Sequence, residues 1–233
     1  DKWPDFSTLN TEQLTNLLDD PSLAVRQFSR QELWKQTIES AEGVAKAVSR
    51  WVQEDPASRI LEKLWIAEVI AEPVNQDLTQ MLSQANPKAR RTLLRSLWRQ
   101  RQELGHDAIP QLVDFMMKQT SHEDARIRME AIASLGQLDA NQFPTAFDAV
   151  LQATSKPIDD NIDFAIWQSL RKLDQSYQQG SILTELNWDG RSNQLGFAVT
   201  AIGTNDAAEV ALKRLEATAF PANEQNAMVQ AIA

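Results

Sequence analysis

The sequence predicts an all-α protein, an α-α superhelical solenoid of about six to seven helical hairpins with no β-sheet. Prolines recur along the chain at intervals of nearly one length, and the apolar residues that follow them keep helical spacing. No segment shows the sustained alternation and β-branched enrichment that are typical of strands.

Two sets of prolines punctuate the predicted repeat. Pro21, Pro56 and Pro87 lie 35 and 31 residues apart, and the same series continues at roughly double steps. A second, offset set is spaced by 37 and 34 residues: Pro73, Pro110 and Pro144. Because proline interrupts helices, two sets with one period indicate two breaks per repeat, as a helical hairpin requires.

Acidic or amide residues before these prolines mark helix starts. The pairs are Asp20-Pro21, Asp55-Pro56 and Asn86-Pro87. An Asp or Asn side chain accepts a hydrogen bond from an unpaired backbone N–H, and proline suits the first helical position. Each pair therefore opens the second helix of a hairpin. Asp124 keeps the acid without the proline.

Together these signals divide the chain into as many as seven predicted helical hairpins. The second helices are expected to begin near residues 22, 56, 87, 124, 157, 190 and 222. The first helices are expected near 11–18, 41–54, 75–85, 107–119, 142–154, 176–186 and 206–218.

The apolar residues of the second helices form one-sided stripes. One stripe consists of Ala89, Leu93, Leu94, Leu97 and Trp98. A lone hairpin cannot bury such a face, so neighbouring hairpins must stack and share one core. We therefore expect residues 1–233 to form a single repeat domain. The last residues lie in an apparent helix without a cap, so we expect the parent chain to continue.

The stretch DDPSLAVRQFSRQEL resembles a HEAT repeat. In that family an acid and an arginine form a ladder of hydrogen bonds between successive repeats, and the resemblance implies such a ladder here. Its acceptors would be Asp20 (or Asp19), Asp55, Asn86 and Asp124, and its donors Arg26, Arg59, Arg90 and Arg128. The fifth unit carries Asp163 where the arginine is expected, so the ladder should lapse there.

A narrower resemblance concerns LLDDPSLAVRQFSRQEL and DDNIDFAIWQSLRKL. These stretches are similar to the helical-repeat region of exported bacterial proteins of the membrane-bound dehydrogenase-like or haem-binding CxxCH type. The resemblance implies a scaffold segment in an exported, periplasmic parent protein. Neither a propeller nor a CxxCH motif lies in this sequence, so no redox residue is assigned, and the sequence itself does not indicate a compartment.

The composition excludes several classes of function and site. Cysteine is absent and the formal net charge is −9, which disfavours general nucleic-acid binding because neutralising phosphates needs cationic side chains. No apolar run has the roughly 20 residues of a membrane span. His106 and His122 lie at opposite ends of one expected helix, too far apart to share a metal. We expect no catalytic residue, cofactor or metal in this segment.

Four cations recur on one face of the helix expected from residue 87: Lys88, Arg91, Arg95 and Arg99. We call them the cationic stripe. Like charges one helical turn apart repel each other, so we expect acidic side chains nearby to compensate the cations. Those acids could be intramolecular, with Glu62, Glu68, Glu72, Glu123 and Glu130 as candidates, or could belong to an anionic partner.

Tryptophan recurs in the second helices as Trp34, Trp65, Trp98 and Trp167. The regularity favours packing between repeats, with a row of partner-binding aromatic residues as the alternative. Trp188 sits at an expected turn, where we expect it to be partly exposed.

Two functions remain open. The first is a non-catalytic scaffold that contacts other protein domains, above all domains of the same parent chain. The alternative is a nucleic-acid-binding enzyme such as a DNA glycosylase built from HEAT-like repeats, although no residue matches the catalytic constellation of those enzymes.

Overall fold

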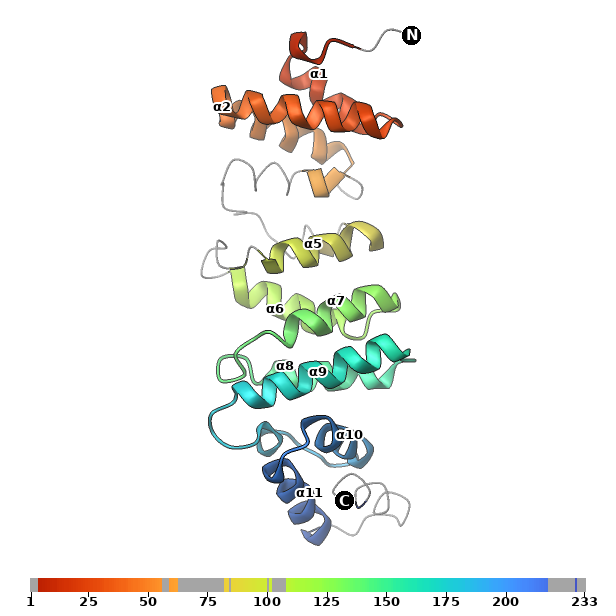
Figure 1. Cartoon of the computed structure of the whole chain (residues 1–233), viewed down its shortest axis with the longest axis vertical. Coiled ribbons are helices and arrows are strands. Elements are labelled where there is room, and N and C mark those ends of the chain that lie inside the picture. Colours follow the sequence, from red (N-terminus) through yellow and green to blue (C-terminus); the bar gives the residue numbers. More distant parts are fainter. Residues whose placement is uncertain are drawn as a thin grey trace. The chain divides into compact units, whose positions relative to one another are not determined.

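A computed structural model describes residues 4–55, 59–62, 82–83, 85–99, 101, 108–217 and 229. Helices dominate this part of the chain and no strand occurs in it, which confirms the predicted α-solenoid class (Figure 1). The residue contacts fall into two compact units, residues 1–109 and 110–233. The single repeat domain stays a prediction.

Unit 1 begins with the 3₁₀ helix η1 (Phe6–Thr8), followed by α1 (Thr11–Asn16) and η2 (Leu17–Asp19). Two reciprocal hydrogen bonds between Asn10 and Gln13 cap the start of α1. Asn10 accepts a hydrogen bond from the Gln13 backbone N–H, and the Gln13 side chain accepts one from the Asn10 N–H. This capping box satisfies two otherwise unpaired donors. Helix α1 packs against α2.

Helix α2 (Leu23–Glu54) is two helices joined at a kink. Ser40 has φ −153° and ψ 80°, outside the helical region, and its Oγ accepts a hydrogen bond from the Gly43 N–H at 3.2 Å. A serine that caps the following segment explains why the helix stops and restarts here. The kink confirms the predicted boundary between the first hairpin's second helix and the helix expected at 41–54.

Helix α5 (Pro87–Arg99) begins where the Asn86-Pro87 pair predicts. The Asn86 Oδ1 accepts a hydrogen bond from the Ala89 N–H at 2.9 Å. The residues buried on α5 are those of the predicted stripe: Ala89, Leu93, Leu94, Leu97 and Trp98.

Unit 2 continues the same alternation. Helix α6 (Ala108–Gln119) begins at the boundary between the units, and α7 (Ala125–Leu135), α8 (Thr145–Gln152), η3 (Ala153–Ser155) and α9 (Asp160–Ser176) follow. After η4 (Ile182–Glu185), the chain forms α10 (Ser192–Ile202) and α11 (Asn205–Ala217). These positions confirm the helices expected near 107–119, 124, 142–154, 157, 190 and 206–218 to within a few residues.

Helices α7 to α11 pack on their neighbours in the series. Helix α9 contacts α8 in its own hairpin, α7 in the hairpin before and α10 in the hairpin after, and α11 packs on α10 (Figure 1). Helices α7 and α9 approach closely at Gly136, where a Cβ atom would lie 2.7 Å from the Ser169 Cα. Nearest-neighbour packing of this kind is what a solenoid requires.

The sixth hairpin departs from the prediction. A first helix was expected at 176–186, but α9 extends to Ser176 and only the short η4 follows. The backbone is already extended at Tyr177 (φ −81°, ψ 121°), and Gly180, with a left-handed φ of 102°, lies in the connection that follows. Trp188 is only 4% exposed, and its indole N–H donates to the Leu183 carbonyl at 2.8 Å, so its expected partial exposure is wrong.

Some predictions lie wholly or partly outside the described residues. They are most of the helix from 56, most of the helix at 75–85, most of the helix from 222, Trp65, Glu68, Glu72 and His106.

Candidate functional site

The arginines of the predicted ladder mainly satisfy backbone carbonyls. Arg128, only 5% exposed, donates through Nη1 to the carbonyls of His122 and Glu123 at 2.8 and 3.0 Å. Its Nη2 donates to the Pro157 carbonyl in the next hairpin at 2.7 Å. One buried guanidinium therefore ties the turn before α7 to the turn before α9.

Arg26 and Arg90 act in the same way within their hairpins. Arg26 donates to the Asp20 carbonyl at 2.5 Å. Arg90 donates to three carbonyls at 2.9 to 3.0 Å: Leu82, Ser83 and Ala85. The carbonyls at the end of a helix have no hydrogen-bond donor within the helix, and these arginine side chains supply the missing donors.

Arg59 makes the acid–arginine bond that the ladder predicts. Its Nη2 donates to the Asp19 carboxylate at 2.5 Å, across successive hairpins. The guanidinium also lies 4.6 Å from the centre of the Trp51 ring and donates to the Trp51 carbonyl.

The predicted acceptors serve chiefly as local caps. Asp20 accepts from the Ser22 N–H and Asp124 from the Arg126 N–H, both at 2.8 Å. Asn86 caps α5 as described above, and Asp55 is the residue at which α2 ends. The capping role inferred from the Asp/Asn-Pro pairs is thus confirmed at Asn86, while the side-chain ladder stays a prediction beyond Asp19 and Arg59.

Ion pairs join hairpins one repeat apart. Arg30 on α2 pairs with Glu62, and this hydrogen bond raises the pKa of Arg30. Lys156 pairs with Glu123 at 2.5 Å, and its hydrogen bond lowers the pKa of the Glu123 carboxyl. The Glu123 carboxylate is exposed, so the Lys156–Glu123 pair contributes little to stability, whereas the Arg30–Glu62 pair is mostly shielded from solvent.

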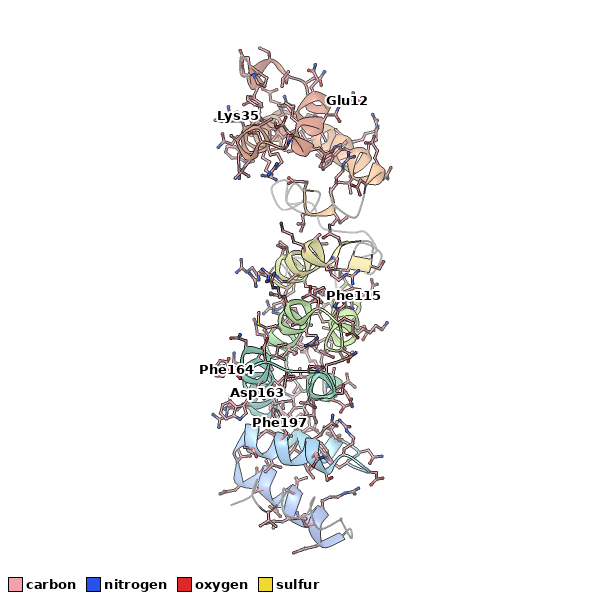
Figure 2. The ribbon with its side chains drawn as sticks, turned by 90° about the vertical axis from the view of Figure 1, so that its right-hand side faces the viewer. Glu12, Lys35, Phe115, Asp163, Phe164 and Phe197 are labelled. Atoms are coloured by element: carbon pink, nitrogen blue, oxygen red, sulfur yellow. The ribbon has the colours of Figure 1, made fainter. Side chains whose placement is uncertain are left out.

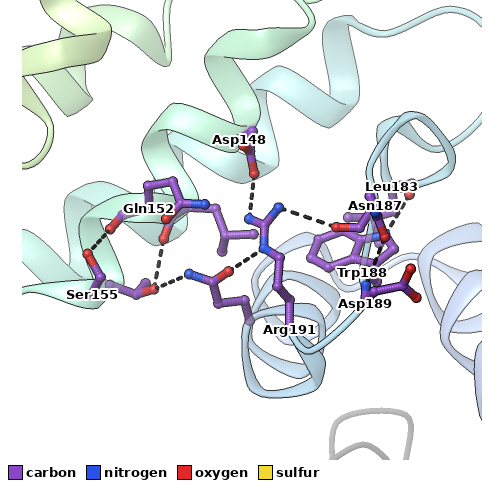
Figure 3. A network of polar contacts seen from close by, with 11 residues as sticks. Asp148, Gln152, Ser155, Leu183, Asn187, Trp188, Asp189 and Arg191 are labelled. Atoms are coloured by element: carbon purple, nitrogen blue, oxygen red, sulfur yellow. Dashed lines mark hydrogen bonds and ion pairs between the residues drawn. The ribbon is translucent and has the colours of Figure 1, made fainter.

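Arg191 forms a second polar junction in unit 2, one that the sequence pattern does not predict. It donates to the Asp148 carboxylate on α8 at 2.5 Å and to the Gln194 side chain at 2.6 Å. Gln194 in turn contacts Thr154, so the network reaches from α10 back to the end of α8 (Figure 3). Arg191 has no counterpart at a repeated position, so periodicity could not reveal it.

The cationic stripe lies on α5 opposite its buried face. Lys88, Arg95 and Arg99 are exposed and Arg91 is half-buried. Among the described residues, no acid pairs with Lys88, Arg91 or Arg99. Two of the candidate acids are engaged elsewhere, Glu62 with Arg30 and Glu123 with Lys156.

The tryptophans combine packing with cation stacking. Trp98 is buried and lies beneath Arg101 at 4.4 Å, and Trp167 is half-buried beneath Arg171 at 4.3 Å. Trp34 is 51% exposed on the outer face of α2. The packing interpretation therefore holds for Trp98, is partial for Trp167 and is wrong for Trp34.

A cavity of about 180 Å³ lies between α1 and the second half of α2. Glu12 and Asn16 line it from α1, and Lys46, Arg50 and Trp51 line it from α2. The Trp51 indole nitrogen is buried without a hydrogen-bond partner in the described structure.

The described residues contain neither a candidate metal site nor a candidate membrane span. In the described parts of both units, no three His, Cys, Asp or Glu side chains are grouped so that they could hold a metal ion. No helix among the described residues is long and apolar enough to cross a bilayer.

The fold and these contacts define the class first: an α-solenoid whose polar side chains join consecutive helical hairpins. Residues 75–171 match a family model described as HEAT repeats, a range that includes α5 to α8 and most of α9. The match and the helical fold together support a HEAT-like repeat protein. No curated protein and no solved structure matches the chain.

Proposed function

We propose that the chain is a non-catalytic helical-repeat scaffold that mediates contacts between proteins or protein domains, and that the cationic stripe on α5 binds an acidic segment of the partner. The observation that carries the proposal is the division of α5 into two faces. One face buries five apolar residues in the scaffold, and the other presents four cations.

The electrostatics of α5 favour an anionic partner. Like charges one turn apart cost a few tenths of a kcal/mol per pair, and within the described residues Lys88, Arg91 and Arg99 have no acid to offset this. An acidic segment would offset the repulsion when it binds. The net charge of −9 opposes nucleic acid more than a short acidic segment, because a nucleic acid brings phosphates along its whole length against the rest of the chain.

The finer proposal is that the partner is another domain of the same, exported parent protein. It is supported by the resemblance of DDPSLAVRQFSRQEL and DDNIDFAIWQSLRKL to repeat regions that lie between domains. The reading frame that encodes the parent tests it: a signal peptide and a CxxCH module in that frame are the expected result, and their absence contradicts this finer proposal alone.

The stripe is tested by fluorescence anisotropy with a labelled glutamate-rich peptide. Replacing Arg91 and Arg99 together by Gln should weaken binding by roughly threefold to tenfold, since exposed ion pairs contribute up to about 1 kcal/mol each. The matched control replaces Lys46 and Arg50 by Gln, two other exposed cations one turn apart, and should leave the affinity unchanged. Equal loss in both variants, or tighter binding of duplex DNA than of the peptide at physiological salt, contradicts the proposal.

A further inference from the structure

The outer surface of α9 carries an exposed aromatic side chain beside two unpaired acids. Phe164 is 57% exposed, and Trp167, one turn further along, is half-buried. Asp160 and Asp163 are both exposed and lie one turn before Phe164 and Trp167, respectively. Figure 2 shows Asp163 and Phe164 on α9. Positions i, i+3, i+4 and i+7 of a helix share one face, so these four side chains form one surface. We call it the α9 surface.

Several other acids of unit 2 are already engaged. Asp148 pairs with Arg191, Asp189 with Arg214, and Glu123 with Lys156. Asp159 caps α9 by accepting from the Asn161 and Ile162 N–H groups. Asp160 and Asp163 have no side-chain partner among the described residues.

The Asp163 side chain is exposed because a carboxylate cannot replace the arginine found at this position in the preceding hairpin. The corresponding position in the preceding hairpin is Arg128, which is buried because it donates to three carbonyls. A carboxylate cannot donate to carbonyls, so Asp163 cannot take over that role and its side chain faces solvent. The helix dipole favours an acid in the first turn of α9, which accounts for Asp163. It does not account for the exposed ring of Phe164.

The α9 surface is held on a rigid support. Ile162, Ile166, Leu170 and Leu173 on the opposite face are at most 2% exposed. The Ser169 hydroxyl donates to the Ile132 carbonyl of α7 at 3.0 Å. Arg171 covers one face of Trp167, so the ring orientation is fixed before any partner arrives.

We propose that the α9 surface docks a basic segment of a partner protein that carries an aliphatic or aromatic side chain. Charge complementarity sets the occupant: two unpaired carboxylates attract Lys or Arg, and they repel phosphate and acidic peptides. Phe164 supplies the apolar contact and a ring face on which a cation can stack. The α9 surface belongs to unit 2 and is negatively charged, whereas the cationic stripe belongs to unit 1. Either proposal can therefore fail without the other.

The test is the affinity of the whole chain for a labelled peptide of arginine and leucine, measured against an arginine–glycine peptide of equal charge. The chain's overall negative charge will attract both, so the difference between the peptides and the effect of variants are the decisive readouts. The leucine peptide should bind more tightly, and Phe164→Ala should abolish that difference with a loss of about tenfold.

The acids are tested separately. Replacing Asp160 and Asp163 by Asn should weaken binding of both peptides several-fold and reduce its salt dependence, whereas Asp114→Asn, at an exposed position on α6, should not. Leu212→Ala on α11 is the control for Phe164→Ala, since Leu212 is 46% exposed. Thermal melts of all variants distinguish lost binding from lost helix stability.

Three outcomes overturn the proposal. The first is that neither peptide binds at low salt, and the second is that the α9 variants bind like their controls. The third is concentration-dependent self-association of the free chain that Phe164→Ala abolishes, which would make a second copy the occupant.

Discussion

At the scale of the residue, Arg128 shows how one side chain fixes the relation between two hairpins. Its three hydrogen bonds end on carbonyls of its own turn and of the next hairpin. Sequence spacing revealed that an arginine recurs, because the recurrence is local. It could not reveal the acceptors, because every residue has a carbonyl and only the folded path of the chain decides which ones face the guanidinium.

Replacing Arg128 by Ala should lower the free energy of unfolding by about 2–4 kcal/mol, since hydrogen bonds to charged groups are strong and three carbonyls lose a buried donor. Arg128→Met keeps most of the packing volume and isolates the hydrogen-bond contribution. Arg126→Ala, at an exposed position on the same helix, should change stability by less than about 0.5 kcal/mol. Urea denaturation measures all three, and an equal effect of Arg126→Ala and Arg128→Ala would contradict the assignment.

Asp174 provides a pH-dependent prediction. Burial raises the pKa of its carboxyl, the nearby charge of Asp206 adds to this, and hydrogen bonds from Ile182 and Ser181 oppose it. The folded chain therefore holds this proton to higher pH than the unfolded chain, whose carboxyl titrates near pH 4. Asp174 thus makes stability fall as pH rises from about 4 through the folded pKa.

Asp174→Asn should remove that contribution, because the amide oxygen can still accept both hydrogen bonds and carries no charge. Urea midpoints between pH 4 and 7 should show a smaller decrease with rising pH in the variant than in the parent chain. If the two profiles run parallel, Asp174 titrates alike in the folded and unfolded chains and this interpretation is wrong.

At the scale of the element, α5 separates scaffold from surface. Leu97 is fully buried, and Arg99 is exposed two residues later. Leu97→Ala should lower the free energy of unfolding by about 2–5 kcal/mol through lost transfer energy and a residual cavity. Arg99→Ala should change it by less than about 0.5 kcal/mol. Chemical denaturation distinguishes the two, and similar costs for both would show that the face of α5 is misassigned.

The contact between α7 and α9 is set by a glycine. A Cβ atom at position 136 would lie 2.4 to 2.7 Å from three atoms of Ser169, one of them its Cα. Since the backbone itself must move, Gly136→Ala should cost about 1–3 kcal/mol in spite of the better helix propensity of alanine. Gly43→Ala meets only the Ser40 side chain and should cost less. Equal thermal shifts for both would contradict close packing at Gly136.

At the scale of the whole molecule, the sequence predicts the order and type of the hairpins well, because caps and apolar spacing are local signals. Asn86-Pro87 places α5, and the stripe from Ala89 to Trp98 is its buried face. The first helix of the sixth hairpin escapes prediction, because α9 continues to Ser176 and only the short 3₁₀ helix η4 follows before Trp188. Polar contacts such as Arg191–Asp148 also escape it, since nothing repeats at those positions.

Energetic coupling in such a fold should extend only to neighbouring hairpins, because each repeat packs on the repeats beside it. Arg191 and Asp148 belong to adjacent hairpins and share an ion pair. The double-mutant cycle of Arg191→Ala with Asp148→Ala should therefore give a coupling energy of about 0.5–3 kcal/mol.

Arg128 and Arg214 lie in hairpins of unit 2 that are separated by two others, and the residues that bind them are different. The effects of Arg128→Ala and Arg214→Ala on the free energy of unfolding should add to within about 0.3–0.5 kcal/mol. Urea denaturation of the four variants and the two doubles measures both cycles. A large coupling in the distant cycle would mean that unit 2 unfolds through contacts other than those between successive hairpins, and the solenoid account of its stability would then fail.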